Sequence, residues 1–406
     1  MEPMMPPFRI ARLPSIEFGA GTRAMLPALA RRFGQRALLV TGGASLLDGP
    51  FWPELARGFA EAGVSLGECR IAGEPAPGLV DDSVRAWRDA GIEVVIAIGG
   101  GSALDAGKAI AGLLPGGGSV LDYLEGVGPE LPYRGPALPL IAVPTTAGTG
   151  SEATKNAVLS VQGPDGYKKS FRDEQLVAAV AVVDPDFLVT CPPAVIAGNG
   201  MDALTQLLEA YISARANPLC DALALDGLRR VRDGLLPLAR DPGDAAARAN
   251  MAYAALLSGM VLAQTGLGSV HGLASPLGAL FPIPHGVVCG TLVAAATRVN
   301  VQALRERDPA HPALAKYAQL GRLLSAVHHG PDHAETPAED DAAAADTLVA
   351  LLEDWTERLA LPRLGALGVT RADHARIVAG SRGSSMKTNP IVLSDAEIGA
   401  ILGARQ

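Results

Sequence analysis

The hydrophobic positions in the first half of the chain form short continuous runs that end in Gly, Pro or Thr. Such runs, rich in Val, Ile, Leu and Ala, lie at residues 35–43, 91–102, 138–150 and 176–185. Runs this apolar are typical of strands that are buried on both faces, as in a parallel sheet. The pattern therefore predicts four buried strands.

Helical patterns separate these runs, at Pro53 to Ala62, Val80 to Ala90 and Ala103 to Leu113. Alternation of strands and helices favours βαβ units and a doubly wound parallel sheet. From about Pro192 onward, long Ala- and Leu-rich segments follow one another with few β-branched clusters. We therefore predict an α/β domain over residues 1–191 and an all-α domain over residues 192–406.

One stretch of the second half lacks charge altogether. From Ala249 to Thr297 the chain contains no Asp, Glu, Lys or Arg, although these residues make up 19% of the whole sequence. Helices that are apolar all round are normally buried, so this stretch predicts core helices. Its only residues that could ionise near neutral pH are His271 and His285.

The overall composition excludes several classes of partner. The net charge of -8 and the absence of long Lys or Arg runs oppose binding to nucleic acid or to an anionic membrane. No continuous apolar run is long enough to span a membrane, and the N-terminal apolar part is too short for a signal peptide. Four widely spaced cysteines without a C-x-x-C pair favour free thiols in a reducing compartment. We therefore expect a soluble cytoplasmic protein.

Residues 328–346 are acidic and contain Pro, Gly and three histidines. The composition predicts a solvated loop, with metal binding by the histidines as the alternative.

A glycine loop follows the second predicted strand and precedes a predicted helix. Gly99, Gly100, Gly101 and Ser102 would let the backbone approach a phosphate, and the N–H groups that open the helix favour an anion. The loop is neither a Walker A motif nor G-x-G-x-x-G, because Leu104 stands at the last glycine position. The alternative is an ordinary strand-to-helix turn.

A second loop, residues 144–152, follows the third predicted strand. Thr145, Thr146 and Thr149 could donate hydrogen bonds to phosphate or ribose oxygens. Because open α/β sheets bind ligands at strand ends, the two loops together favour a nucleotide site.

Candidate metal ligands occupy one predicted helix and the charge-free stretch. Asp202, Gln206 and Glu209 have the spacing i, i+4 and i+7, which places them on one helix face. Carboxylates and imidazoles are common ligands of divalent metals, so His271 and His285 complete a possible site. The alternatives are an amphipathic helix and two histidines bonded to backbone carbonyls.

Five segments, in order, resemble the iron-containing alcohol dehydrogenase family: GGGSALDAGK, PTTAGTGSE, GMDALTQLLEAY, HGLASPLGALFPIPHG and SRGSSMKTNPIVLS. The resemblance implies a dinucleotide-binding domain (residues 1–191), a helical metal-binding domain (residues 192–406) and a metal and substrate cleft between them. The implied metal ligands are Asp202, Gln206, His271 and His285. The implied cofactor contacts are Gly42, Gly99, Gly100, Gly101, Ser102, Thr145, Thr146, Thr149 and Lys168.

The sequence departs from the family pattern at three positions. Many members have His where Gln206 stands, and a neutral amide is a weaker ligand, so the metal could be Fe²⁺, Zn²⁺ or another divalent ion. Many also have a His, assigned to proton transfer, where this chain has Ser275. NAD-preferring members often carry an Asp after the first strand, whereas this chain has Gly42 and no carboxylate nearby. This favours NADP, with NAD as the alternative.

The resemblance implies reversible hydride transfer between NAD(P) and a small alcohol or aldehyde. Asp202, His271 and His285 would hold a Lewis-acidic metal, and the proton would leave through water, a ribose hydroxyl or Ser275. The alternatives are a maleylacetate reductase, a sugar-phosphate cyclase resembling 3-dehydroquinate synthase, and a non-catalytic protein. A homodimer or higher homo-oligomer is the expected assembly.

Overall fold

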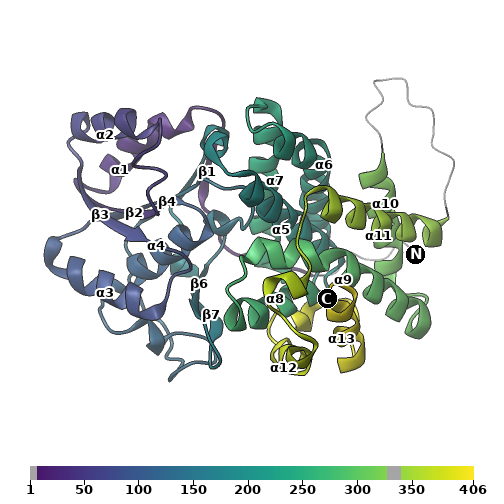
Figure 1. Ribbon diagram of the computed structural model, residues 1–406. Helices are drawn as coiled ribbons and strands as arrows, with labels where there is room; N and C mark the ends of the chain where they lie inside the picture. The colour runs from purple at the N-terminus through teal and green to yellow at the C-terminus, as the bar shows by residue number, and fades with distance from the viewer. Residues whose placement is uncertain (1–6, 327–339) are drawn as a thin grey trace.

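The computed structural model describes residues 7–326 and 340–406, and its N-terminal half is built on one parallel sheet (Figure 1). The six strands lie in the order β1-β8-β5-β4-β2-β3, and every neighbouring pair is parallel. The strands are β1 (Ser15–Phe18), β2 (Arg36–Gly42), β3 (Ser65–Ile71), β4 (Val94–Gly99), β5 (Leu140–Pro144) and β8 (Val180–Val183).

Helices cover both faces of this sheet. On one face Leu39 and Ile96 pack with residues of α1 and α2, such as Phe59. On the other face Leu38 and Val95 pack with α3 and α4. The helices are α1 (Leu26–Phe33), α2 (Trp52–Glu61), α3 (Pro77–Trp87) and α4 (Gly101–Leu113). The predicted doubly wound α/β fold is confirmed.

The strand order fixes where a ligand can bind. The chain runs from β2 outward to β3 and then returns to place β4 on the other side of β2. The order therefore reverses between β2 and β4, which makes their carboxyl ends the topological switch point of the sheet. Gly42 ends β2 and Gly99 ends β4, so two predicted cofactor residues lie at this point.

The hydrophobic runs predicted the central strands β2, β4, β5 and β8 but not the remaining ones. Strands β1 and β3 lie at the two sheet edges and are only partly buried, so they lack continuous apolar runs. A separate antiparallel hairpin, β6 (Asn156–Val161) and β7 (Tyr167–Arg172), was also not predicted. It packs against α4 and α8 (Ser269–Leu280).

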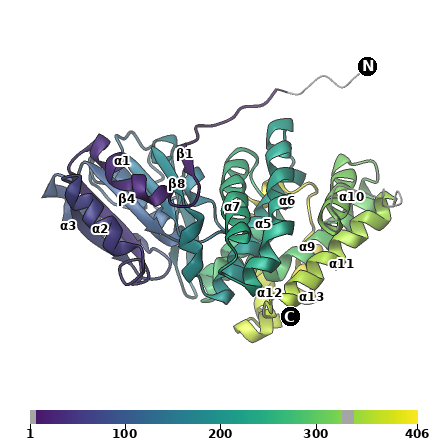
Figure 2. The same cartoon turned by 90° about the horizontal axis from the view of Figure 1, so that it is seen from above.

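The C-terminal half is helical, as predicted (Figure 2). Helix α5 is almost completely buried and packs against α6, α7 and α9. The helices, besides α8, are α5 (Pro193–Ile212), α6 (Pro218–Arg240), α7 (Ala245–Thr265), α9 (His285–Arg307), α10 (Pro312–Ser325), α11 (Asp341–Arg358), α12 (His374–Gly380) and α13 (Asp395–Ala404). The exact boundary at residues 191 and 192 stays a prediction.

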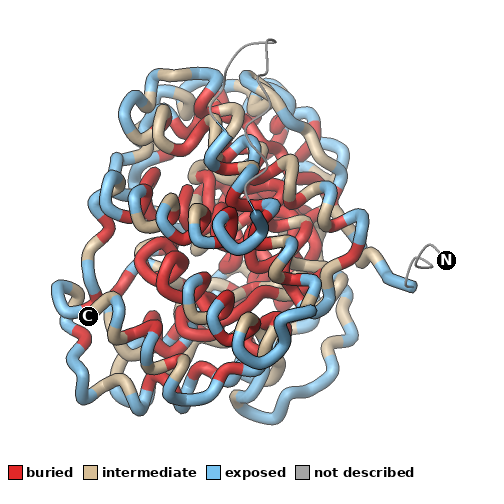
Figure 3. Tube along the Cα trace, turned by 90° about the vertical axis from the view of Figure 1, so that its right-hand side faces the viewer, coloured by how far each residue is buried: buried red, intermediate tan, exposed pale blue. Residues whose placement is uncertain are grey.

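The charge-free stretch forms most of α7, all of α8 and the first half of α9. Helices α7 and α8 meet at an angle of 100°, at the break that contains Gly266 and Gly268. Helix α9 is long and apolar enough to cross a membrane, but 78% of its apolar window is buried inside the protein. Buried segments run through the centre of the helical half (Figure 3), which agrees with the predicted core helices.

The acidic loop predicted at residues 328–346 lies mostly outside the described residues, and its described end is not a loop. Residues 327–339, which include all three of its histidines, lie outside the described residues, as do residues 1–6. The prediction is wrong for its last residues, because α11 begins at Asp341 with the side chain of Asp340 capping its first turn. The capped N-terminus and the alanine run favour a helix there. All four cysteines are free thiols, as expected.

Candidate metal and cofactor site

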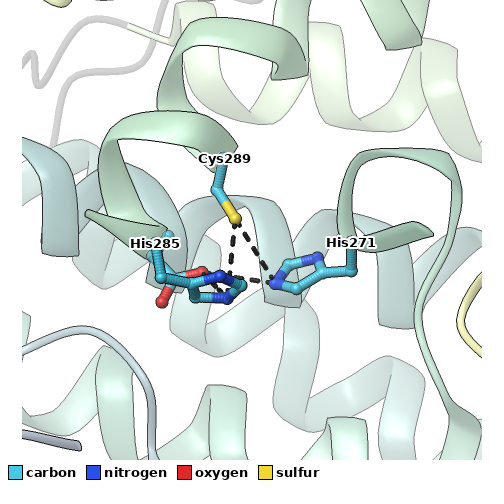
Figure 4. Close-up of side chains that lie close together, drawn as sticks. His271, His285 and Cys289 are labelled. Atoms are coloured by element: carbon cyan, nitrogen blue, oxygen red, sulfur yellow. Dashed lines mark hydrogen bonds and ion pairs between the residues drawn. The ribbon is translucent and has the colours of Figure 1, made fainter. Parts of the chain in front are cut away.

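Four potential metal ligands converge between helices α5, α8 and α9. The Nε2 atom of His271 lies 3.3 Å from Asp202 Oδ1, and the Nε2 atom of His285 lies 3.8 Å from the same oxygen. The Sγ atom of Cys289 lies 3.7 Å from His271 Nε2 and 3.8 Å from His285 Nε2. Figure 4 shows the thiol and both imidazoles pointing toward one another. One potential ligand atom from each of the four residues lies within 4.8 Å of the others.

Glycines allow the helices to approach closely enough for this convergence. A Cβ atom on Gly286 would lie 2.5 Å from the carbonyl oxygen of Gly198 on α5. A side chain at either position would push the start of α9 away from α5. The glycine after His285 therefore lets α9 begin against the helix that carries Asp202.

Glu209 fixes the orientation of His271. Its Oε2 atom lies 2.7 Å from His271 Nδ1, and its Oε1 atom accepts a 2.7 Å hydrogen bond from the backbone N–H of Val270. A carboxylate on Nδ1 favours the tautomer that leaves Nε2 unprotonated and free to bind a metal. The sequence placed Glu209 on the same helix face as Asp202 but gave it no separate role.

The buried polar atoms of the site test whether a metal fits. Asp202 is completely buried, and its Oδ2 atom has no hydrogen-bond partner within the described part of the chain. A buried carboxylate oxygen without a partner is costly. A divalent cation held by Asp202, His271 and His285 would compensate that charge, and carboxylate and imidazole are suitable ligands for it. The residues therefore fit a metal.

Burial and neighbouring charges set the protonation of the metal-free site. Burial opposes ionisation of Asp202, but the neighbouring His285 and His271 hold its pKa at about 2. Burial and nearby positive charges lower the pKa of His285 to about 4. Burial raises the pKa of Cys289 to about 12. Burial opposes protonation of His271, but Cys289, Asp202 and Glu209 raise its pKa well above its ordinary value. At neutral pH the metal-free site therefore holds an ionised carboxylate, a neutral imidazole at position 285 and a protonated thiol, and a bound metal would displace a proton from His271.

Two predicted site residues flank this cluster. Gln206 lies one turn after Asp202 on α5, and its amide oxygen accepts a 2.8 Å hydrogen bond from the Ser258 hydroxyl. Ser275 lies one turn after His271 on α8 and is exposed. Its exposure gives the hydroxyl access to water, which suits the predicted proton route. Its role stays a prediction.

The two predicted cofactor loops lie side by side at the switch point. The backbone N–H of Thr145 donates a 2.9 Å hydrogen bond to the carbonyl of Gly99. A Cβ atom on Gly99 would lie 3.1 Å from the backbone nitrogen of Gly42, and one on Gly101 would lie 2.8 Å from Thr149. The backbone is so closely packed there that only glycine fits at positions 99 and 101.

The remaining predicted cofactor residues of the two loops lie around the N-terminus of α4. Gly100 is the N-cap residue of α4, so the first N–H groups of that helix open beside it. A Cβ atom on Gly100 would lie 3.4 Å from the Thr146 hydroxyl. Ser102 lies in the first turn of α4 and is half-buried. A helix N-terminus with adjacent hydroxyls is suited to bind a pyrophosphate.

A buried lysine, which the sequence analysis did not select, connects helix α4, which follows the glycine loop, to the end of the threonine loop. The ammonium group of Lys108 on α4 is completely buried and donates to the hydroxyls of Ser151 at 2.6 Å and Thr154 at 2.9 Å. It also pairs with Asp105 at 3.3 Å. These contacts hold the helix that follows the glycine loop against the loop that follows β5. The GGGSALDAGK segment contains both Asp105 and Lys108, but spacing alone does not reveal their contacts.

Lys168, a predicted cofactor residue, lies on β7. Its ammonium group forms a 2.6 Å ion pair with Glu74, which also accepts a 2.5 Å hydrogen bond from Ser160. The same ammonium group lies 3.9 Å from the position that a Cβ atom on Gly278 of α8 would take. Lys168 therefore lies between the sheet domain and the helix that carries His271.

Comparison with known families shows which family the chain belongs to. The family described as "Iron-containing alcohol dehydrogenase" matches residues 14–185, and "Fe-containing alcohol dehydrogenase family, C-terminal" matches residues 196–405. The chain belongs to the iron-containing alcohol dehydrogenase family. The predicted family and the predicted class of enzyme, an alcohol dehydrogenase, are confirmed.

Several curated members of this family are similar over most of their length. Alcohol dehydrogenase 4 of Saccharomyces cerevisiae is 34% identical over 81% of this chain and 80% of its own. The 4-hydroxybutyrate dehydrogenase of Cupriavidus necator is 34% identical over 80% of each chain. The probable alcohol dehydrogenase EutG of Escherichia coli is 32% identical over 96% of this chain and 92% of its own.

Solved structures of family members share the complete fold. The crystal structure of a 1,3-propanediol oxidoreductase superposes with a TM-score of 0.88 at 27% identity, covering 99% of this chain and 100% of the other. Sulfoacetaldehyde reductase from Bifidobacterium kashiwanohense, solved with NAD⁺, superposes with a TM-score of 0.83 at 26% identity, covering 98% of both chains. A divalent metal and NAD(P) are the cofactors of this family, as predicted.

Proposed function

We propose that this protein transfers a hydride reversibly between NAD(P) and a small primary alcohol or its aldehyde. The observation that carries the proposal is the buried carboxylate of Asp202, whose free oxygen faces no partner within the described residues while His271 and His285 converge on the other. The family match and the dehydrogenase names of the relatives favour this activity over a sugar-phosphate cyclase or a maleylacetate reductase.

We assign the metal-binding role to Asp202, His271 and His285. When bound, a divalent cation at this position supplies Lewis-acid catalysis toward the substrate oxygen. The three side chains hold fixed positions, because α5, α8 and α9 pack tightly and Glu209 orients one imidazole. The apolar residues of the charge-free helices around these side chains would keep bulk water away from the reaction.

The cofactor role belongs to the loops at the switch point. The glycine loop and the N-terminus of α4 would bind the pyrophosphate, while the threonine loop would contact the cofactor from the next strand. No carboxylate follows β2 directly, so nothing there repels a 2′-phosphate. We therefore propose NADP as the preferred cofactor.

The proposal is tested with purified protein on a panel of short alcohols and aldehydes. We expect oxidation or reduction with NAD(P), preference for NADPH over NADH, and loss of activity after metal chelation. Asp202→Asn should abolish activity, whereas the control Asp89→Asn, at an exposed position of the other domain, should leave it unchanged. Full activity after complete metal removal would overturn the metal assignment.

We further propose that the enzyme is cytoplasmic and forms a homodimer or a higher homo-oligomer. Most soluble oligomers are homo-oligomers, and dimers are the commonest among them. Its partners would be small molecules, without nucleic acid or membrane. Analytical ultracentrifugation should give a mass of at least twice that of one chain, and a monomer at assay concentration would contradict this.

A further inference from the structure

Cys289 differs from the other three cysteines in what its thiol contacts. Its Sγ atom lies within hydrogen-bonding range of His271 Nε2 and His285 Nε2, the two nitrogens that point toward the metal position. By contrast, Cys69 contacts Ser83, Cys191 contacts the carbonyl oxygen of Thr145, and Cys220 contacts Asn217. Cys289 is also completely buried.

The separations between the four potential ligand atoms are close to those of ligands around one metal ion. Ligands bound to zinc at about 2.0 to 2.3 Å in a tetrahedron are separated from one another by about 3.3 to 3.7 Å. Of the six separations among Asp202 Oδ1, the two Nε2 atoms and Cys289 Sγ, four are 3.3, 3.7, 3.8 and 3.8 Å, and none exceeds 4.8 Å. The thiol therefore lies where a fourth ligand would lie.

The surroundings favour the thiol over the amide as this fourth ligand. Gln206 is neutral, and its amide oxygen already accepts a hydrogen bond from Ser258. Without the thiolate, Asp202 would be the only anion that contacts a divalent cation directly. A thiolate would supply a second negative charge in a buried site where water cannot screen the cation.

We propose that Cys289 binds the metal as a thiolate, so that the ligand set is Asp202, His271, His285 and Cys289. The inference rests on the proposed function, because it concerns the same metal. The S–H bond breaks, the sulfur–metal bond forms, and the proton passes to solvent. Soft thiolate ligands favour Zn²⁺, so this chain should select zinc over the hard ions Mg²⁺ and Mn²⁺. A substrate can still approach, since catalytic zinc sites expand to five ligands.

The test replaces the metal by Co²⁺, whose electronic spectrum reports its ligands. Metal-free protein is titrated with Co²⁺, and absorption is recorded for the wild type, Cys289→Ser and the control Cys220→Ser. Cys220 is a buried thiol whose contacts lie outside the cluster. We expect an intense near-ultraviolet band from thiolate-to-cobalt charge transfer in the wild type and the control. Cys289→Ser should bind Co²⁺ with the same stoichiometry but at least about tenfold more weakly, and it should lack the band.

The outcomes separate this inference from the proposed function. If the wild type binds one Co²⁺ and Asp202→Asn does not, but the wild type shows no charge-transfer band, the thiolate assignment is wrong and the metal site stands. A band that persists in Cys289→Ser also overturns the assignment. Failure of the wild type to bind Co²⁺ contradicts both. If Cys289→Ser does not fold, Cys289→Ala serves instead, and the wild-type spectrum remains decisive.

Discussion

Replacing Glu209 by Gln would exchange one carboxylate oxygen for an NH₂ group in the centre of the site. The two carboxylate oxygens of Glu209 each meet one donor, the backbone N–H of Val270 and the Nδ1 position of His271, both at 2.7 Å. Gln has only one oxygen, so its NH₂ group must face one of the two donors. If it faces His271, the imidazole must move its proton to Nε2, which then cannot bind a metal.

The size of the expected loss in metal affinity follows from the role of Glu209 in orienting His271. Loss of a partner that orients a metal-binding histidine typically weakens metal binding by about 10- to 100-fold, which equals about 1.4 to 2.7 kcal/mol. We expect the upper part of this range, because Glu209 and His271 are both buried and water cannot replace the missing acceptor.

The assay is a competition titration of Zn²⁺ between the protein and a chromophoric chelator. The control is Glu61→Gln, a change of the same chemistry at an exposed position at the end of α2. Glu209→Gln should raise the dissociation constant and Glu61→Gln should not. An unchanged dissociation constant in Glu209→Gln, with folding intact by circular dichroism, would refute the role of Glu209 in orienting His271.

Three further predictions concern stability and cofactor choice. Burial raises the pKa of Glu152 from 4.5 to about 7. The carboxyl group therefore stays protonated up to a higher pH in the folded state than in the unfolded state. The free energy of unfolding should therefore fall by about 3 kcal/mol as pH rises from about 4.5 to 7. Urea unfolding of Glu152→Gln should show no such dependence on pH, and the same dependence in the variant would contradict this. A Cβ atom on Gly259 would lie 2.0 Å from the Gly150 carbonyl oxygen, whereas one on Gly399 would meet nothing within 4 Å. Gly259→Ala should cost about 3 kcal/mol of unfolding free energy and Gly399→Ala should gain about 0.5 kcal/mol, and equal effects would count against the helix packing. An added Cβ atom on Gly42 meets nothing within 4 Å, so Gly42→Asp should fit and lower kcat/KM for NADPH relative to NADH by about tenfold or more; an unchanged ratio would place the 2′-phosphate elsewhere.

Much of the fold could be predicted from the sequence, because its central elements carry strong patterns. Strands buried on both faces require continuous apolar runs, and β2, β4, β5 and β8 have them. Edge strands have one exposed side, and the residues of β3 before Ile71 are exposed or half-buried, so the strand has no such run. Pairing partners that are distant in the chain, such as β1 and β8, leave no local pattern at all.

The site shows the same division. Asp202, His271 and His285 could be selected, because polar residues stand out within apolar helices and their motifs resemble a known family. Cys289 could not, since a cysteine in an apolar helix has the pattern of an ordinary core residue. Lys108 was also missed, because its partners Ser151 and Thr154 lie on another loop. Contacts of this kind depend on how the sheet and helices pack.

We propose that the alcohol dehydrogenase activity depends on a divalent metal held by Asp202, His271 and His285. The most direct measurement is the metal content of the purified protein, taken together with NAD(P)-dependent oxidation of short alcohols before and after exhaustive chelation. We expect one divalent ion per chain, loss of activity when the ion is removed, and recovery of activity when the ion is returned. Undiminished activity in protein shown to be free of metal would contradict it.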